Sequence, residues 1–134
     1  MKAVFVTYCS RDKRKDEGDI FAIERYISNR IMKVYESSKI VLADFMILSG
    51  EFGLLNYDDT IPYYDHLFVM EEVEDYIKKV TKQLMEKNIK KIVFFTESLK
   101  DDPNLKPYQI SIFKACKNLN IEFMMSEMSK EINN

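Results

Sequence analysis

The stretch KAVFVTYC, residues 2–9, is an apolar run that follows a single lysine, and it is rich in β-branched and aromatic side chains. Such a run predicts a β-strand. Because it shows no polar alternation, it is typical of a strand covered on both faces, as in the parallel sheets of α/β proteins. A polar loop, SRDKRKDEGD, follows at residues 10–19 and ends the strand.

Downstream of this strand, apolar runs alternate with helical periods. Three runs predict further strands: ADFMILS (43–49), KKIVFFTES (90–98) and IEFMMS (121–126). Three periodic segments predict helices: Ile20 to Val34 with Asp19 as N-cap, Met70 to Leu84, and Pro107 to about Asn118.

The alternation of strands and helices predicts an α/β fold for the whole chain, residues 1–134, as a single domain. We expect three layers: a mostly parallel sheet of about four strands, with helices on both faces. Right-handed crossovers place the carboxyl ends of parallel strands at one edge of the sheet, which is called the carboxyl edge below. Ligands of open α/β sheets bind at that edge, so the residues that follow each strand are the first candidates for a site.

Composition limits the classes of function. Charged residues make up 31% of the chain, which favours a well-solvated surface, and the net charge of −2 gives no overall attraction to nucleic acid. A local basic patch keeps nucleic acid open as a partner, and its residues are Arg11, Lys13, Arg14 and Lys15. No segment reaches the roughly 18 apolar residues of a membrane span. The short N-terminal apolar run does not resemble a secretion signal, so we expect a cytoplasmic protein without membrane contact.

The second predicted strand runs into SGEFG, residues 49–53, which holds two of the three glycines of the chain. Gly50 and Gly53 would permit a positive φ or a close approach of a ligand to the main chain. Ser49 could cap a turn or bind a ligand, and Glu51 could act as a general acid or base. The alternative is a plain turn that needs glycine to fold back.

The segment YYDH, residues 63–66, carries the sole histidine of the chain. In an extended segment Tyr64 and His66 share one face, while Asp65 lies on the other, so we expect Tyr64 and His66 to face a ligand together. The alternative is a histidine with an ordinary surface role. One histidine and two distant cysteines make no zinc pattern, and no metal or cofactor is expected.

The first strand ends in CSRDK, residues 9–13. Cys9, Ser10 and Lys13 could receive an anion at the start of the loop, with help from main-chain N–H groups. The alternative is a buried cysteine beside a solvated run of charges.

Taken together, these motifs resemble an uncharacterised α/β domain family of bacteria, archaea and phages. Its members carry a Cys-Ser-x-x-Lys start, a Leu-Ser-Ala-x-x-Gly-Leu segment and a Pro-Tyr-Asp segment, and the matching residues are CSRDK (9–13), LSGEFGLL (48–55) and YD (64–65). The pattern is also similar to the peroxide-stress protein family, whose members are linked to DNA binding and iron-related oxidative defence. A further similarity is to a domain of archaeosine synthase, which acts on a 7-deazaguanine base in tRNA.

The resemblance covers roughly residues 3 to 68. It implies an α/β fold and marks site residues at Cys9, Ser10, Lys13, Ser49, Gly50, Gly53, Tyr64 and Asp65. The chain departs from the pattern at two places. Tyr63 stands where the family has proline, and Arg14-Lys15 replaces the Pro-Tyr that follows the lysine in archaeosine synthase.

The expected function is the binding of a nucleobase, nucleoside or nucleotide at the carboxyl edge, with glycosyl transfer or base modification as the reaction. Tyr64 would contact the base, and Glu51 or Asp65 would act as general acid or base. A phosphate or the reacting group would be held by Cys9, Ser10 and Lys13. The alternative is a nucleic-acid-binding or oxidative-stress protein without catalysis.

Overall fold

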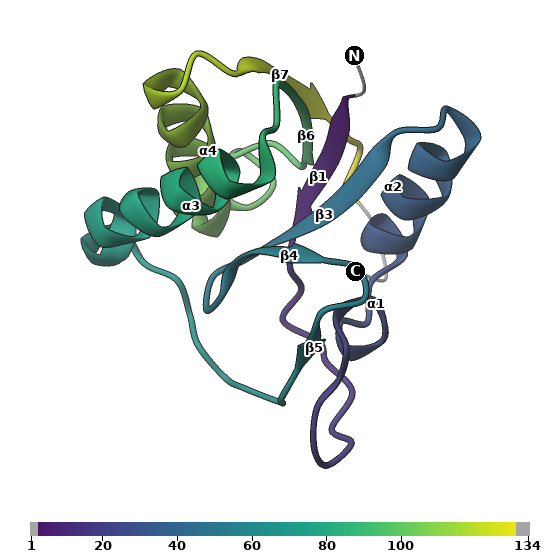
Figure 1. The fold of residues 1–134 in the computed structure, drawn as a ribbon. Helices are drawn as coiled ribbons and strands as arrows, with labels where there is room; N and C mark the ends of the chain where they lie inside the picture. The colour runs from purple at the N-terminus through teal and green to yellow at the C-terminus, as the bar shows by residue number, and fades with distance from the viewer. Residues whose placement is uncertain (1–2, 131–134) are drawn as a thin grey trace.

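The structure is a computed structural model and describes residues 3–130. Its centre is a five-stranded sheet in the order β4-β3-β1-β6-β7 (Figure 1). The strands are β1 (Val4–Tyr8), β3 (Asp44–Ser49), β4 (Gly53–Asn56), β6 (Lys91–Thr96) and β7 (Glu122–Glu127). All neighbours are parallel except β3 and β4. The prediction of an α/β fold with a mostly parallel sheet is confirmed, with one strand, β4, beyond the four expected.

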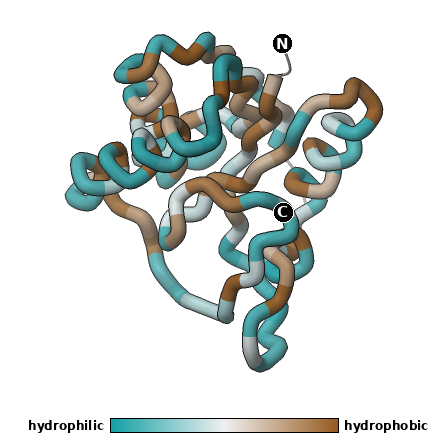
Figure 2. The backbone as a smooth tube through the Cα atoms, viewed as in Figure 1, coloured by the Kyte–Doolittle hydropathy of each residue, from teal (hydrophilic) through white to brown (hydrophobic). Residues whose placement is uncertain are grey.

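Helices cover both faces of the sheet, as expected. Helix α2 (Asn29–Ile40) packs on β1 and β3, while α3 (Val73–Lys87) and α4 (Lys106–Asn118) pack against each other on the opposite face (Figure 1). The alternation of β1 divides its side chains between two cores: Val6 lies with α3 and α4, and Phe5 lies with α2. Figure 2 shows the apolar colour concentrated along the central strands, where both cores meet the sheet.

The predicted helix from Ile20 to Val34 is wrong in its first half. Ile20–Phe21 forms a short strand, β2, that pairs antiparallel with β5 (Thr60–Ile61), and a single turn, α1 (Ala22–Arg25), follows. The chain is then extended at Tyr26 and Ser28, and Ser28, not Asp19, caps the start of α2 by accepting the Ile31 N–H at 3.2 Å. The break is fixed because the main chain there pairs with the loop after β1, where Ile27 N–H bonds to the Asp12 carbonyl.

The edge strand β4 is held from outside by a side-chain amide. Gln83 of α3 accepts the Leu54 N–H at 2.8 Å and donates to the Phe52 carbonyl at 3.1 Å, so it occupies main-chain groups that a free edge would expose. Gly53 has a φ of +76°, and a Cβ there would overlap the side-chain oxygen of Gln83. Gly53 therefore allows the positive φ of the turn and the close approach of the Gln83 side chain, and it is not needed for a ligand to approach.

Replacing Gln83 with alanine is expected to lower the free energy of unfolding by about 1–3 kcal/mol, because the buried Leu54 N–H loses its acceptor. Chemical denaturation gives the total loss, and hydrogen exchange at Leu54 should accelerate by more than at β1. Lys82→Ala, at the neighbouring exposed position of α3, is the matched control. Equal stability of the two variants would show that the amide does not hold the edge.

Among the helices of residues 3–130, none combines the length and the apolar character needed to cross a bilayer.

Candidate functional site

The loops after β1 and β3 meet at the carboxyl edge, as the sequence predicted. The Tyr64 hydroxyl lies 3.1 Å from Ser49 Oγ, and Cys9 Sγ lies 3.4 Å from the hydroxyl of Tyr108, which comes from the first turn of α4. Ser49 is fully buried. Cys9, Tyr64 and Tyr108 pack in one core cluster and Ser49 bonds to Tyr64, so Cys9, Ser49 and Tyr64 lie together.

Tyrosines fill most of this edge. We call Tyr26, Tyr64, Tyr76 and Tyr108 the tyrosine cluster. The Tyr26 and Tyr64 hydroxyls lie 2.5 Å apart, and Tyr76 donates to the Ser49 carbonyl at 2.6 Å. Burial raises the pKa of each phenol in the cluster above its ordinary value, so the hydroxyls stay protonated and act as hydrogen-bonding groups.

Gly50 is required by the packing of the aromatic side chains at this edge. A Cβ at this position would lie 2.8 Å from the Phe68 Cβ and 2.8 Å from the Tyr108 hydroxyl. Both distances are shorter than ordinary van der Waals contacts, so any other residue would push the two aromatic side chains away. The glycine allows Phe68 and Tyr108 to close over the end of β3.

A buried guanidinium anchors the end of β1. Arg30, 1% exposed, donates from Nη1 to Thr7 Oγ1 and to the Tyr8 carbonyl, each at 2.7 Å, and from Nη2 to the Cys9 carbonyl at 3.1 Å. Its Cζ lies 3.5 Å from the centre of the Tyr8 ring. Burial lowers the pKa of Arg30, but an arginine remains charged in water at neutral pH. Arg30 thus fixes the main chain from which the candidate loop departs.

Beside the tyrosine cluster the carboxyl edge opens into a cleft of about 370 Å³ between the β3–β4 turn and the first turns of α3. We call it the acidic cleft. Four carboxylates, one lysine, one histidine and two aromatic rings line it around Gly50: Glu51, Glu71, Glu72, Asp75, Lys79, His66, Phe68 and Tyr76.

His66 joins two carboxylates on the wall of the acidic cleft. Its Nδ1 lies 2.5 Å from Glu51 Oε1, and its Nε2 lies 2.9 Å from Glu72 Oε2. The hydrogen bonds to Glu72 and then to Glu51 raise the pKa of His66, against the opposing effect of burial. The same pairing lowers the pKa of Glu72. The raised pKa favours the imidazolium form of His66, in which both ring nitrogens donate, and the hydrogen bond to Glu51 holds that carboxylate at a fixed place in the cleft.

The remaining predicted site residues lie outside the acidic cleft. Ser10 Oγ donates to the Asp12 carbonyl at 2.7 Å, and Lys13 Nζ lies 4.5 Å above the Tyr64 ring. Asp65 is exposed and does not line the cleft. The structure thus brings Gly50, Glu51 and His66 together in the cleft and leaves Ser10, Lys13 and Asp65 apart from it.

The contribution of α3 and of the 3-10 turn before it (Met70–Glu72) to the cleft was not predicted from the sequence. Glu72, Asp75 and Lys79 follow one another at spacings of three and four residues, which places them on one face of a helix. Acidic residues in a first turn are also favoured by the helix dipole, so these carboxylates were explained by that general preference and not assigned to a site.

The raised pKa of His66 has a consequence for stability that depends on pH. Protonated His66 contributes stability that is fully present below its ordinary pKa of 6.5 and is lost as pH rises through the higher folded-state value. Glu72 contributes in the opposite sense: its share is lost as pH falls below its ordinary pKa of 4.5 and through the lower folded-state value.

We therefore expect the melting temperature of the native chain to fall above neutral pH relative to that of His66→Gln. Because His66 is the sole histidine, its ring signals in an NMR titration give the pKa directly. A value at or below the ordinary 6.5 would contradict the double ion pair.

Within residues 3–130, no group of three or more His, Cys, Asp or Glu side chains is arranged to hold a metal ion. Comparison of the chain with protein-family models, with curated proteins and with solved structures gave no match.

Proposed function

We propose that the acidic cleft binds a nucleobase or nucleoside. The reaction is hydrolysis of the N-glycosidic bond or transfer of the glycosyl group. The observation that carries the proposal is the hydrogen-bonded pair of Glu51 and His66 on the wall of an open cleft at the carboxyl edge. Open α/β sheets bind their ligands at this edge.

The size and charge of the cleft favour a nucleoside over a nucleotide. A volume of about 370 Å³ lies within the range of small-molecule sites, roughly 300–1,000 Å³. Four carboxylates against one ammonium leave the lining negatively charged in either protonation state of His66. Such a lining repels a phosphate and stabilises positive charge that develops on a sugar ring.

The proposed reaction uses His66, which lies between Glu51 and Glu72. Departure of the base breaks the C1′–N bond, the electron pair moves to the base nitrogen, and the transition state resembles an oxocarbenium ion. His66 can donate the Nε2 proton to the base nitrogen when the base replaces Glu72 as acceptor. Donation from Nε2 leaves a neutral imidazole that keeps its Nδ1 proton toward Glu51. Glu51 accepts the proton of the attacking water or hydroxyl and releases it to solvent, and Nε2 regains a proton from solvent. Asp65 has no part in this scheme because it lies outside the cleft.

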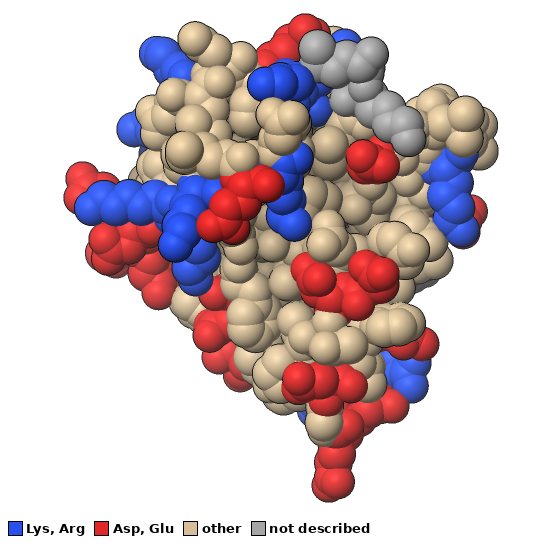
Figure 3. Space-filling model, viewed as in Figure 1, with Lys and Arg blue, Asp and Glu red and all other residues tan. Residues whose placement is uncertain are grey.

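The loop of residues 11–15 has less support as a nucleic-acid-binding surface. Arg14 is paired with Asp16 at 2.8 Å, and Lys13 covers the Tyr64 ring. In the view of Figure 3, carboxylates dominate the lower part of the molecule, where this loop and β5 lie. Phosphate contacts need several unpaired cations on one face.

A thermal-shift assay with adenosine, guanosine, cytidine and uridine, each beside its 5′-monophosphate, tests the proposal. A nucleoside at ten times its Kd should stabilise the chain by about 1.4 kcal/mol, while the matching monophosphate should stabilise it much less. Chromatography of the same mixtures should detect the released base.

Glu51→Gln should lose both the shift and the reaction, and Glu74→Gln, an exposed position of α3 outside the cleft, should keep both. Equal effects of nucleosides and monophosphates would contradict the proposal, as would the absence of any shift.

A further inference from the structure

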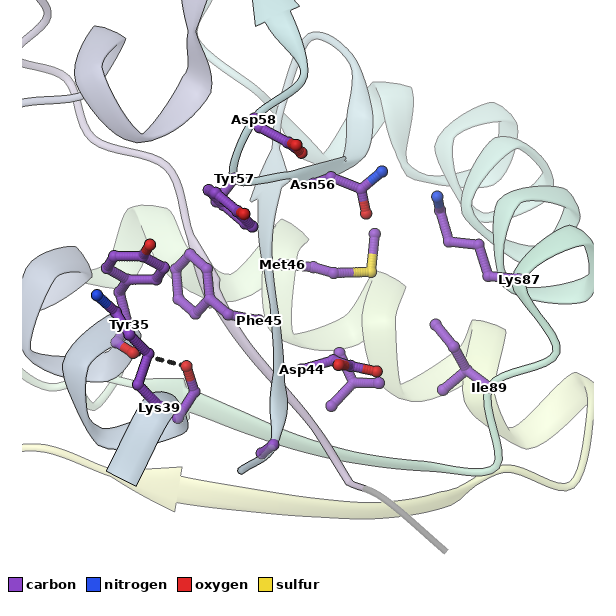
Figure 4. Close-up of a pocket in the computed structure, with 13 residues that line it drawn as sticks. Tyr35, Lys39, Asp44, Phe45, Met46, Asn56, Tyr57, Asp58, Lys87 and Ile89 are labelled. Carbon is purple, nitrogen blue, oxygen red and sulfur yellow. Dashed lines mark hydrogen bonds between the residues drawn. The ribbon is translucent and has the colours of Figure 1, made fainter. Parts of the chain in front are cut away.

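A larger cavity lies at the opposite edge of the sheet, away from the acidic cleft. It has a volume of about 520 Å³ and opens where β3 begins and β4 ends (Figure 4). We call it the amino-edge cavity. Side chains from α2, β3, the β4–β5 turn and the end of α3 line it, among them Tyr35, Asp44, Phe45, Tyr57, Asp58 and Lys87.

One side of the amino-edge cavity is aromatic. The rings of Tyr35 and Phe45 have centroids 5.2 Å apart, and those of Tyr35 and Tyr57 lie 5.5 Å apart. Figure 4 shows these three rings on one side of β3, and Met46 and Ile89 on the other. The cavity therefore offers apolar surface on both sides of the strand, which suits a flat apolar group.

The edge of β3 is open inside this cavity. Strand β4 pairs with β3 only as far as Asn56 opposite Met46. The Asp44 N–H and the Leu48 carbonyl bond to residues on the β1 side, so the odd-numbered residues of β3 direct their main-chain groups toward β4. The Phe45 N–H and carbonyl consequently point toward the cavity beyond the end of β4.

Charges of both signs border the same space. Asp44, Asp58 and Lys87 are exposed, and no ion pair between described residues includes any of them. Figure 4 shows Asp44 and Lys87 on the side of β3 that faces Ile89. The C-terminal ends of α2 and α3 also lie at this edge, and their partial negative charge favours a cation.

We propose that the amino-edge cavity binds a free α-amino acid with an aromatic side chain. The ammonium group lies with Asp44 and the carboxylate with Lys87, both on the Ile89 side of β3, and the ligand reaches across the open edge of the strand to the aromatic side. The side chain packs on Tyr35, Phe45 and Tyr57, while the main-chain groups of Phe45 supply hydrogen bonds. The amino-edge cavity is separate from the acidic cleft, because the two share no lining residue.

Amide NMR titrations with L-phenylalanine, L-phenylalaninamide and N-acetyl-L-phenylalanine test each part of the recognition. L-phenylalanine should shift the signals of Asp44 to Met46 and of Tyr57. The amide lacks the carboxylate and the N-acetyl compound lacks the ammonium group. Each should therefore bind about tenfold more weakly than L-phenylalanine, a loss of about 1.4 kcal/mol in binding free energy.

Single substitutions separate the two charges. Lys87→Met should bind L-phenylalanine and its amide with equal affinity, and Asp44→Asn should reduce the preference over the N-acetyl compound. Lys82→Met, an exposed position of α3 that does not line the cavity, should leave all three affinities unchanged. Equal binding of the three probes to the native chain overturns the proposal. So does an absence of shifts at Asp44 to Met46, or a loss of affinity with the N-acetyl compound alone.

Discussion

Replacing Arg30 with methionine is expected to lower the free energy of unfolding by about 3–5 kcal/mol, because each buried acceptor left without its donor costs about 1–3 kcal/mol. The guanidinium donates to three acceptors at the end of β1, and it is almost fully buried. Methionine fills much of the same volume but donates nothing, so the buried Thr7 hydroxyl and the Tyr8 carbonyl each lose a hydrogen bond.

Chemical denaturation of Arg30→Met measures this loss. Arg11→Met, an exposed position in the loop after β1, is the control and should change the stability by less than about 0.5 kcal/mol. A loss below about 1 kcal/mol in Arg30→Met, the size of one ordinary hydrogen bond, would show that the end of β1 does not depend on the guanidinium.

Replacing Gly50 with alanine is expected to cost about 1–3 kcal/mol and to weaken nucleoside binding as well. The new methyl group would lie 2.8 Å from both Phe68 and Tyr108, so both side chains must move, and Phe68 is part of the lining of the acidic cleft. The change combines a packing defect with a distorted site.

Gly18→Ala separates the effect of packing from that of backbone conformation. Gly18 has a φ of +75°, and a Cβ added there would have no neighbouring atom within 4 Å. Its substitution should therefore cost about 1–2 kcal/mol through backbone strain and leave ligand binding intact. Unchanged nucleoside binding in Gly50→Ala would place the ligand away from the acidic cleft.

Much of the fold could be predicted from the sequence because strands covered on two faces have a distinct pattern. The run at residues 2–9 and the run at 90–98 correspond to β1 and β6, and the period from Met70 to Leu84 corresponds to α3. The carboxyl edge followed from right-handed crossovers, and Gly50, Glu51 and His66 do meet there.

Other features depended on contacts between distant residues. The apolar spacing from Ile20 fits a helix, but pairing of Ile20 with Ile61 made that residue part of β2. Gly50 was expected to admit a ligand, whereas its own neighbours Phe68 and Tyr108 occupy the space beside it. Periodicity records which faces are apolar, and it does not record which side chain fills a given space.

The most direct test of the acidic cleft follows the ring signals of His66 by NMR while adenosine or guanosine is added. His66 is the sole histidine, so its signals need no assignment by mutation, and its ring touches both Glu51 and Glu72. We predict a saturable shift of these signals in the native chain and none in Glu51→Gln. Ring signals that stay unchanged at nucleoside concentrations that saturate binding would contradict a nucleoside site in the acidic cleft.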